Sequence, residues 1–156
     1  MQIVIIRPPL VYGPSVRANF RALLSAVMSG IPLPLAAARN RRSMIFVGNL
    51  SSLVIATAFS TRVLPKVLLA SDGHDMAMRD FLKLLATALG RPSRLFPVPA
   101  GLALFGANLL GKGAAAARLF GSLEVDVSET RTALGWDPPY SIEDGIELTA
   151  KAFLSE

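Results

Sequence analysis

The sequence contains no cysteine and only one histidine in 156 residues, and both absences narrow the chemistry open to it. Without cysteine there are no disulfides and no thiolate metal ligands, which is typical of a reducing compartment, so we expect a cytoplasmic protein. The histidine, His74, lies in a turn beside Ser71-Asp-Gly whose surroundings do not suggest a charge-relay site. The acidic residues lack metal-ligand spacing and are interpreted as turn and helix-cap residues. We therefore predict no metal and assign no catalytic residue.

A hydrophobic run long enough to cross a membrane is also missing. One long uncharged stretch, residues 96–111, contains Pro97 and Pro99 and is shorter than the roughly 20 apolar residues that a membrane span needs. We favour a helix packed into a core or onto a neighbour over an interfacial membrane contact. The first residues are typical of a buried strand and not of a signal peptide.

Charged residues are scarce, at 17%, whereas hydrophobic residues make up 52% of the chain. Such a chain is too apolar to be disordered, and part of its apolar surface is expected to face a partner. The net charge is +5, and the tightest basic cluster consists of Arg39, Arg41 and Arg42. Because no aromatic residue or nucleic-acid-binding motif accompanies these arginines, we predict no nucleic-acid partner. A solvated loop with one phosphate-facing arginine is the interpretation we favour.

Five segments have the composition of strands. The β-branched run 3–7 and the run 66–70 are typical of parallel strands covered on both faces. Shorter strands are predicted at 31–35, 44–47 and 123–127. Strands alternate with helical segments along the chain, which indicates an α/β fold built on a parallel sheet.

Apolar residues at helical spacing predict the helices between these strands. One helix is expected to end at Gly30, and another, over residues 78–89, has a single apolar face. Asn49 is placed to cap the helix that follows it. A helical region is predicted over residues 100–120, and the last helix begins at Ser141, where an acidic residue three positions on completes a capping box.

Several of these segments, taken in order, resemble one protein family. They are similar to the C-terminal portion of extended short-chain dehydrogenase/reductases, specifically the NAD-dependent epimerase/dehydratase enzymes that act on nucleotide-diphosphate sugars. The matching segments are RPPLVYGP at 7–14, the helix opened by Asn19 and ended by Gly30, the proline-containing segment 31–35, RSMIFVGNL at 42–50 and LGWDPP at 134–139. The resemblance covers nearly the whole chain.

The resemblance implies a specific α/β architecture. We expect the C-terminal part of a Rossmann-like doubly wound parallel sheet together with a small mixed α/β substrate-binding cap. Residues 1–156 would be a single fragment, the substrate-binding portion. The NAD-binding half, with its glycine-rich cofactor loop, would be a missing N-terminal partner.

The first matched segment implies one margin of a cofactor site. Pro8 and Pro9 take the place of residues that approach the nicotinamide of NAD beyond the carboxyl end of a strand. Leu10 stands where many relatives have an asparagine that touches substrate, which weakens the expectation of a sugar contact there. Tyr12 either donates to a substrate hydroxyl or packs its ring beneath the cap, and we favour packing.

Other matched positions imply a substrate site. Asn19, at the start of a helix, and Arg42 correspond to residues that bind the diphosphate, and a planar guanidinium suits two bridged phosphates. Arg118 lies near the position of a second phosphate-binding arginine. Leu33 and Leu35 match the segment whose backbone pairs with the nucleotide base.

The residues that perform the chemistry in such enzymes are not in this sequence. Neither Tyr12 nor Tyr140 is followed by lysine four positions on, so the Tyr-x-x-x-Lys pair is absent. The resemblance therefore implies that the chain binds the substrate, a UDP-sugar, and we expect it to be inactive when isolated. Two alternatives stay open: an extended relative that acts on an uncharged alcohol, and a non-catalytic interaction module. A homo-oligomer is a further option, and no membrane contact is expected.

Overall fold

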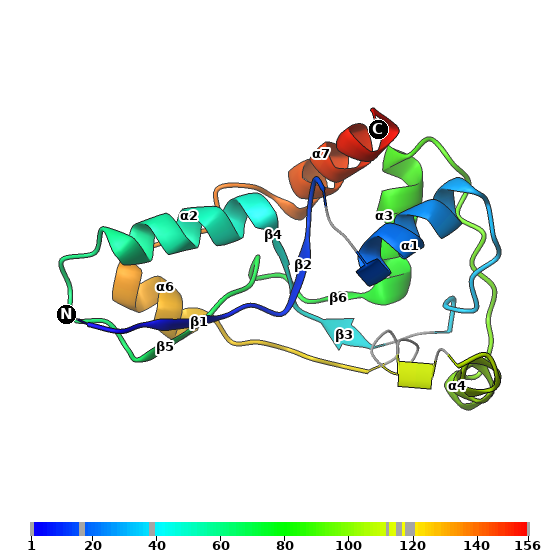
Figure 1. Cartoon of the computed structure of the whole chain (residues 1–156), viewed down its shortest axis with the longest axis horizontal. Helices are drawn as coiled ribbons and strands as arrows, with labels where there is room; N and C mark the ends of the chain where they lie inside the picture. Colours follow the sequence, from blue (N-terminus) through cyan, green and yellow to red (C-terminus); the bar gives the residue numbers. More distant parts are fainter. Residues whose placement is uncertain are drawn as a thin grey trace.

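The structure of the protein is a computed structural model that describes residues 2–15, 18–37, 40–111, 113, 114, 117 and 121–155, without the side chains of residues 18, 19 and 100. Its strands are β1 (Ile5–Arg7), β2 (Leu10–Tyr12), β3 (Arg41–Arg42), β4 (Met44–Phe46), β5 (Val67–Leu69) and β6 (Met76–Ala77). Its helices are α1 (Ala18–Met28), α2 (Val47–Ala58), α3 (Met78–Ala88), α4 (Ala100–Leu109), α6 (Ser128–Leu134) and α7 (Ile142–Leu154). Figure 1 shows an elongated molecule with β1, β5, α2 and α6 at one end and α1, α3 and α4 at the other.

The described strands pair in three short ladders. β1 and β5 are parallel, with Ile5 opposite Val67, so the predicted parallel pairing of runs 3–7 and 66–70 is confirmed. β2 and β4 are also parallel, and β3 pairs with β6 in the antiparallel direction. The α/β fold class predicted from the sequence is therefore confirmed.

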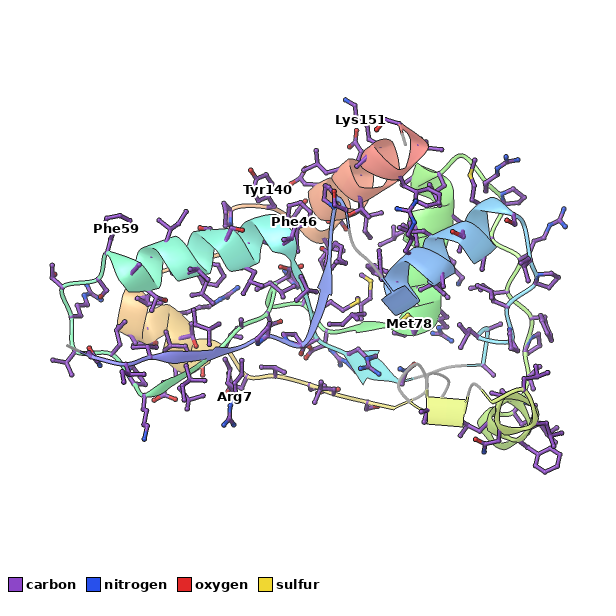
Figure 2. The ribbon with its side chains drawn as sticks, in the orientation of Figure 1. Arg7, Phe46, Phe59, Met78, Tyr140 and Lys151 are labelled. Atoms are coloured by element: carbon purple, nitrogen blue, oxygen red, sulfur yellow. The ribbon has the colours of Figure 1, made fainter. Side chains whose placement is uncertain are left out.

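The prediction that run 3–7 is covered on both faces is wrong for this chain. Ile3 is 68% exposed and Ile5 is 41% exposed, and Arg7 projects away from the ribbon (Figure 2). The physical reason is that only one face of β1, through Ile6, packs on a core cluster, and β5 is its partner on one edge. Among the described residues, an apolar face of β1 and its second edge are thus left without a partner.

Strand β4 separates the two apolar clusters because successive side chains of a strand point to opposite faces. Met44 and Phe46 belong to the larger cluster, and Ile45 belongs to the smaller one. The larger cluster is formed with buried residues of α1, α3 and α7, including Leu24, Phe81, Leu85 and Ile146. The smaller cluster contains Leu53, Ala70 and Trp136. This strand therefore links both halves of the elongated molecule.

Three predicted helices are confirmed together with the signals that start or end them. Past the ends of α1 and α3, Gly30 and Gly90 have φ values of 67° and 65°, a left-handed conformation that glycine adopts without strain. At the start of α7, the Ser141 side chain accepts from the Asp144 N–H, and the Asp144 side chain accepts from the Ser141 N–H. This reciprocal pair is the predicted capping box.

Two of the predicted short strands are not strands in the structure, so these predictions are wrong. Segments 31–35 and 123–127 each contribute only one isolated bridge, Leu33 to Leu95 and Leu123 to Arg42. Proline lacks a backbone N–H, so Pro32 and Pro34 cannot donate to a ladder. The chain instead turns directly after Leu33.

The predicted role of Asn49 as a helix cap is also wrong. Helix α2 begins at Val47 and its N-cap position is Phe46, whereas Asn49 is fully buried inside the helix. Its side chain is engaged in long-range hydrogen bonds, which are described below. Strand β2 and helix α6 were not predicted, because three and seven residues are too short to establish a hydrophobic period.

The uncharged stretch 96–111 forms helix α4 and its flanks. Its side chains Leu102, Phe105, Leu109 and Leu110 are 64–76% exposed, so the expected packing of this helix into a core is not formed within the described residues. No helix in the described part of the chain has the length and apolar character to cross a membrane.

Candidate functional site

Asp72 is a buried carboxylate at the carboxyl end of β5, and its acceptor atoms join several elements. The Tyr12 hydroxyl donates to Oδ2 at 2.9 Å, the Phe46 N–H donates to Oδ1 at 3.0 Å, and Nδ2 of Asn49 donates to Oδ1 at 2.7 Å. The Asp72 N–H in turn donates to the Met44 carbonyl at 2.9 Å. One side chain therefore holds β2, β4 and the first turn of α2 at the end of β5.

Burial sets the protonation of this network. Desolvation raises the pKa of Asp72, and the hydrogen bonds from Asn49, Phe46 and Tyr12 oppose that rise. Desolvation also raises the pKa of Tyr12, as do the Asp72 charge and the hydrogen bond to it. Tyr12 is therefore fixed as a protonated donor and cannot serve as a general base near neutral pH. Its ring packs in the core as predicted, 5.5 Å from that of Phe81.

Tyr140 is tied to the same network through Asn49. Oδ1 of Asn49 accepts from the Tyr140 N–H at 2.9 Å, and Nδ2 donates to the Tyr140 carbonyl at 3.0 Å. The Tyr140 ring lies edge-on to Phe46 at 5.3 Å and stays 42% exposed. The segment that leads into α7 is thereby fixed to α2.

Arg42, the predicted diphosphate ligand, lies in strand β3 with a half-buried side chain. Its Nη1 donates to the Gly121 carbonyl at 3.2 Å, and its backbone bridges Leu123. Its Nε is buried and has no hydrogen-bond partner among the described residues. Desolvation lowers the pKa of the guanidinium below its ordinary value. Neighbouring Arg41 is exposed, as predicted, and pairs with Glu124 at 3.5 Å.

The side chains of three further residues from the sequence analysis, Arg39, Arg118 and Asn19, are not described by the structure. Arg39 and Arg118 lie outside the described residues, and Asn19 is described only by its backbone in the first turn of α1. The structure therefore does not show whether Asn19, Arg42 and Arg118 converge, and their predicted phosphate contacts stay predictions.

The backbone groups of Leu33 and Leu35 already have partners inside the chain. The Leu33 N–H donates to the Arg94 carbonyl at 2.9 Å, and the Leu35 N–H donates to the Leu33 carbonyl at 2.8 Å. Leu33 lines a cavity of about 10 Å³, which is space for no more than a water molecule. Pairing with a nucleotide base would therefore require these contacts to rearrange.

Pro8 and Pro9 leave the carboxyl end of β1, as predicted. The carbonyl of Arg7 accepts from the Ala70 N–H at 3.2 Å, so Pro8 and the segment after β5 lie at the same edge of the parallel pair. Pro8 is exposed and Pro9 is half-buried. Their backbone carbonyls can accept hydrogen bonds and their rings are apolar.

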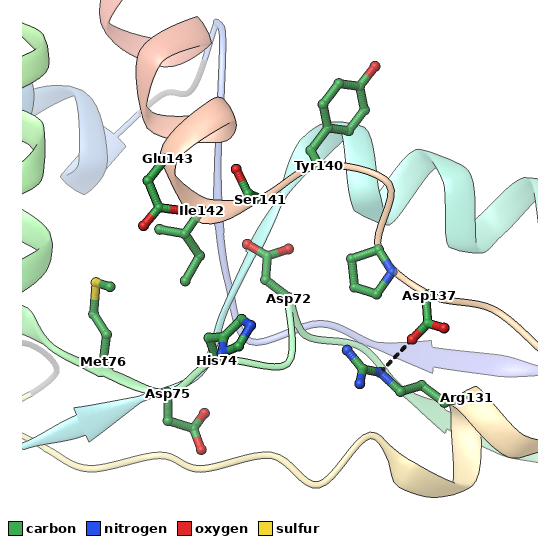
Figure 3. Close-up of a pocket in the computed structure, with 11 residues that line it drawn as sticks. Asp72, His74, Asp75, Met76, Arg131, Asp137, Tyr140, Ser141, Ile142 and Glu143 are labelled. Carbon is green, nitrogen blue, oxygen red and sulfur yellow. Dashed lines mark ion pairs between the residues drawn. The ribbon is translucent and has the colours of Figure 1, made fainter.

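A cavity of about 590 Å³ opens beside Asp72, between the 72–76 loop and the start of α7 (Figure 3). Its titratable lining is mainly acidic and includes Asp75, Asp137 and Glu143; Arg131 also lines it and pairs with Asp137 at 3.3 Å. This acidic lining disfavours a diphosphate, and Arg42 does not line the cavity. In the described ranges no three histidine or acidic side chains are grouped to hold a metal.

Sequence reasoning missed Asp72 and the buried role of Asn49. The available signal was a carboxylate in Ser71-Asp-Gly directly after an apolar strand, a place where an isolated charge needs donors. The donors themselves lie 23 to 60 residues away in sequence, so their identity required the fold.

Comparison with curated proteins finds a relative that matches almost the whole chain. A UDP-glucose 4-epimerase of Vibrio cholerae is 41% identical over 155 residues, which is 99% of this chain and 47% of that protein. No protein-family model matches the chain. The chain thus spans about half the length of this curated relative.

Solved structures of similar fold include a sugar-nucleotide epimerase and an epimerase family protein. A UDP-glucuronic acid 4-epimerase from Bacillus cereus, in complex with UDP-glucuronic acid and NAD, is 17% identical with a TM-score of 0.69, covering 99% of this chain and 46% of that one. A human epimerase family protein with NADPH is 18% identical with a TM-score of 0.78, covering 97% and 49%. The resemblance predicted from the sequence is thereby confirmed: the chain is similar to about half of an extended short-chain dehydrogenase/reductase of the epimerase/dehydratase family and has its α/β fold.

Proposed function

We propose that residues 1–156 act as the substrate-binding portion of a nucleotide-diphosphate-sugar epimerase or dehydratase, with a UDP-sugar as substrate. The observation that carries this proposal is the 41% identity to a UDP-glucose 4-epimerase over 99% of the chain. The contribution of this chain would be to bind and orient the sugar nucleotide.

Arg42 is the residue we propose to hold the diphosphate. Its guanidinium is half-buried, one nitrogen is already fixed on the Gly121 carbonyl, and its buried Nε lacks a partner among the described residues. A partly desolvated cation gains more from an anion than a solvated one, and the guanidinium fork matches two phosphate oxygens. A lysine at this position could supply the positive charge but not the paired, planar N–H donors of a guanidinium.

The cofactor and the catalytic pair would come from a dinucleotide-binding half. NAD supplies hydride acceptance in enzymes of this kind. In this chain, Pro8 and Pro9 would line one side of the NAD site. Tyr12 would not take part in catalysis, because it is buried and its hydroxyl is hydrogen-bonded to Asp72. The exposed Ile3 and Ile5 and the open edge of β1 support the proposal that further strands extend this sheet. On this proposal the isolated chain has no turnover.

A chimera tests the proposal directly. The part of the Vibrio cholerae 4-epimerase that lies outside the match would be fused in front of this chain, and epimerisation of UDP-sugars would be measured with NAD. We expect turnover in the chimera, none in the chain alone, and a loss of at least tenfold in kcat/KM for Arg42→Ala. Turnover by the purified 156-residue chain, or an unaltered Arg42→Ala chimera, contradicts the proposal.

Ligand charge separates this function from the alternative with an uncharged alcohol. Calorimetry on the folded chimera would compare UDP, uridine and a neutral secondary alcohol. UDP is expected to bind at least tenfold more tightly than uridine, because the diphosphate contacts Arg42. Equal affinity for UDP and uridine would favour an uncharged substrate.

A further inference from the structure

Helix α4 and the residue that follows it turn large apolar side chains away from the rest of the chain. Leu102, Phe105, Leu109 and Leu110 are 65%, 64%, 74% and 76% exposed, and their spacing places them on one side of the helix. The half-buried positions of α4 are Ala103, Leu104, Gly106 and Ala107. A helix that packs into a core buries its largest apolar residues, so α4 has the reverse arrangement. A contiguous exposed apolar face of this kind marks an interaction site.

The composition of α4 fits a lipid surface better than a protein surface. The helix contains no charged residue, and Asn108 is its only polar side chain. Protein interfaces have a polar rim and carry about one hydrogen bond per 100–200 Å², for which α4 offers a single side chain. The boundary of a bilayer needs apolar side chains alone, which is what the outer face of α4 presents.

The length of α4 allows it to lie on a bilayer but not to cross one. Its 10 residues span roughly 15 Å, whereas the hydrocarbon core of a bilayer is about 30 Å thick. A helix that lies in the interface buries its apolar face by about 5–10 Å, and leucine and phenylalanine side chains can reach that depth. An orientation parallel to the membrane surface is therefore the one that fits.

The sequence on both sides of α4 is basic. Residues 81–123 contain no aspartate or glutamate, and their basic residues are Lys83, Arg91, Arg94, Lys112 and Arg118. The acidic residues at the two limits of this range have basic partners: Asp80 pairs with Lys83, and Glu124 pairs with Arg41, both at 3.5 Å. Arg94, on the segment that leads into α4, is exposed. This charge complements an anionic surface.

Helix α4 lies far from the strand edge on which a further domain would pair. In Figure 1 the N-terminus and β1 are at one end of the long axis, and α4 is at the other end. A second exposed apolar pair, Phe59 and Val63, follows helix α2 and is 83% and 93% exposed. Figure 2 shows Phe59 at the same end as β1. Because β1 carries the unpaired edge, that end is where the proposed missing half would attach, and it supplies an internal control for α4.

We propose that α4 is an interfacial helix that holds the chain on an anionic lipid surface, with Leu102, Phe105 and Leu109 in the headgroup boundary. Composition alone favours a packed helix over residues 96–111, and the exposure of the large side chains reverses that preference. Burial of the apolar face supplies affinity, and the basic flanks supply selectivity for anionic lipid. This surface is independent of the proposed sugar-nucleotide site, because it includes none of the residues assigned to that site.

Cosedimentation of the 156-residue chain with vesicles tests the proposal. We expect binding to vesicles of phosphatidylcholine mixed with phosphatidylglycerol, and binding weaker by about tenfold or more to phosphatidylcholine alone. The double variant Phe105→Ser/Leu109→Ser should lower the affinity by about tenfold or more, whereas the matched Phe59→Ser/Val63→Ser should change it by less than about twofold. A wild type that does not bind, equal binding to both kinds of vesicle, or equal losses in both double variants overturns the proposal. Circular dichroism checks that these exposed positions leave the fold intact.

A fluorescent label on α4 separates lipid from the missing half as the occupant. The chain has no cysteine, so Leu109→Cys carrying an environment-sensitive fluorophore reports on α4 alone. Its emission is expected to shift to shorter wavelength when the mixed vesicles are added, and a label at Phe59→Cys is expected not to shift. The same label is then placed in the chimera with the Vibrio cholerae portion. A shift that needs vesicles there supports the proposal, whereas a shift on fusion alone, with no further change on vesicles, shows that the missing half covers α4 and overturns it.

Discussion

The hydroxyl of Tyr12 donates to Oδ2 of Asp72 at 2.9 Å and so joins strand β2 to the end of β5 across 60 residues of sequence. The Tyr12 ring is fully buried and lies 5.7 Å from that of Phe46, whose N–H donates to the same carboxylate. The geometry of this strand edge therefore depends on side-chain hydrogen bonds as well as on short ladders.

Asp72→Asn is expected to lower the free energy of unfolding by about 2 to 3 kcal/mol, because the amide nitrogen cannot accept and leaves a buried donor unpaired. Urea unfolding monitored by fluorescence of Trp136 would measure the change. Asp137→Asn is the control: its side chain is 81% exposed, so we expect a change within about 0.5 kcal/mol. Equal effects of both substitutions would contradict the role of the buried network.

The same carboxylate predicts a pH dependence of stability. Burial raises the pKa of Asp72, so in the folded state it lies above the unfolded value of about 3.9. Between these two values the folded chain binds more protons, and stability falls as pH rises. Wild type is therefore expected to lose stability relative to Asp72→Asn as pH is raised from about 4 through the folded pKa. A difference that stays constant or grows with pH in urea titrations would show that the pKa is not raised.

Gly145→Ala tests how tightly α7 packs on the Tyr12 ring. A Cβ at Gly145 would lie 2.8 Å from the Tyr12 hydroxyl and 3.0 Å from the Phe46 ring. Alanine favours a helix over glycine by about 1 kcal/mol, but overpacking costs about 1 to 3 kcal/mol and Tyr12 is fixed by Asp72. We expect net destabilisation of about 1 kcal/mol, measured by urea unfolding.

The control for this substitution is Gly106→Ala in α4, where an added Cβ meets nothing within 4 Å. This variant is expected to be neutral or slightly stabilised. In a Tyr12→Phe background, Gly145→Ala should cost less, because the nearest atom is gone. A larger cost in that background would show that the hydroxyl is not the obstacle.

The helices could be predicted from sequence because their signals are local. α1, α3 and α7 each combine apolar spacing with a nearby glycine stop or a capping box. These local signals are enough to predict where each helix lies in the sequence, without knowledge of its distant contacts. β2 and α6 could not be predicted, because they are too short for a period.

The candidate site was predictable only in part. The resemblance selected Arg42, but the Gly121 carbonyl that fixes its guanidinium lies 79 residues away and has no sequence signature. Asn49 was predicted as a cap because an amide before an apolar run usually has that role; its partners Asp72 and Tyr140 are 23 and 91 residues distant. Long-range polar contacts follow from topology and not from local pattern.

Ser141→Ala is expected to destabilise the chain by about 1 kcal/mol through loss of the α7 cap. The side-chain and backbone hydrogen bonds with Ser141 lower the pKa of Asp144. Because that folded pKa lies below the unfolded one, the stabilisation is present above about pH 3.9 and is lost as pH falls through the folded pKa. NMR titration should show the pKa of Asp144 rising toward its ordinary value in Ser141→Ala. Ser155→Ala, at the far end of α7, should leave it unchanged.

Thermal unfolding with UDP tests the proposed diphosphate contact without requiring turnover. A ligand at 100 times its Kd stabilises the folded state by about 2.7 kcal/mol, so UDP should raise the Tm of a chain that binds it. We expect Arg42→Ala to abolish this rise and Arg42→Lys to reduce it, because lysine keeps the charge but loses the planar fork. Arg41→Ala is the matched control, since Arg41 is exposed and paired with Glu124. If Arg41→Ala removes the rise while Arg42→Ala keeps it, the phosphate-facing arginine of this strand is the wrong one.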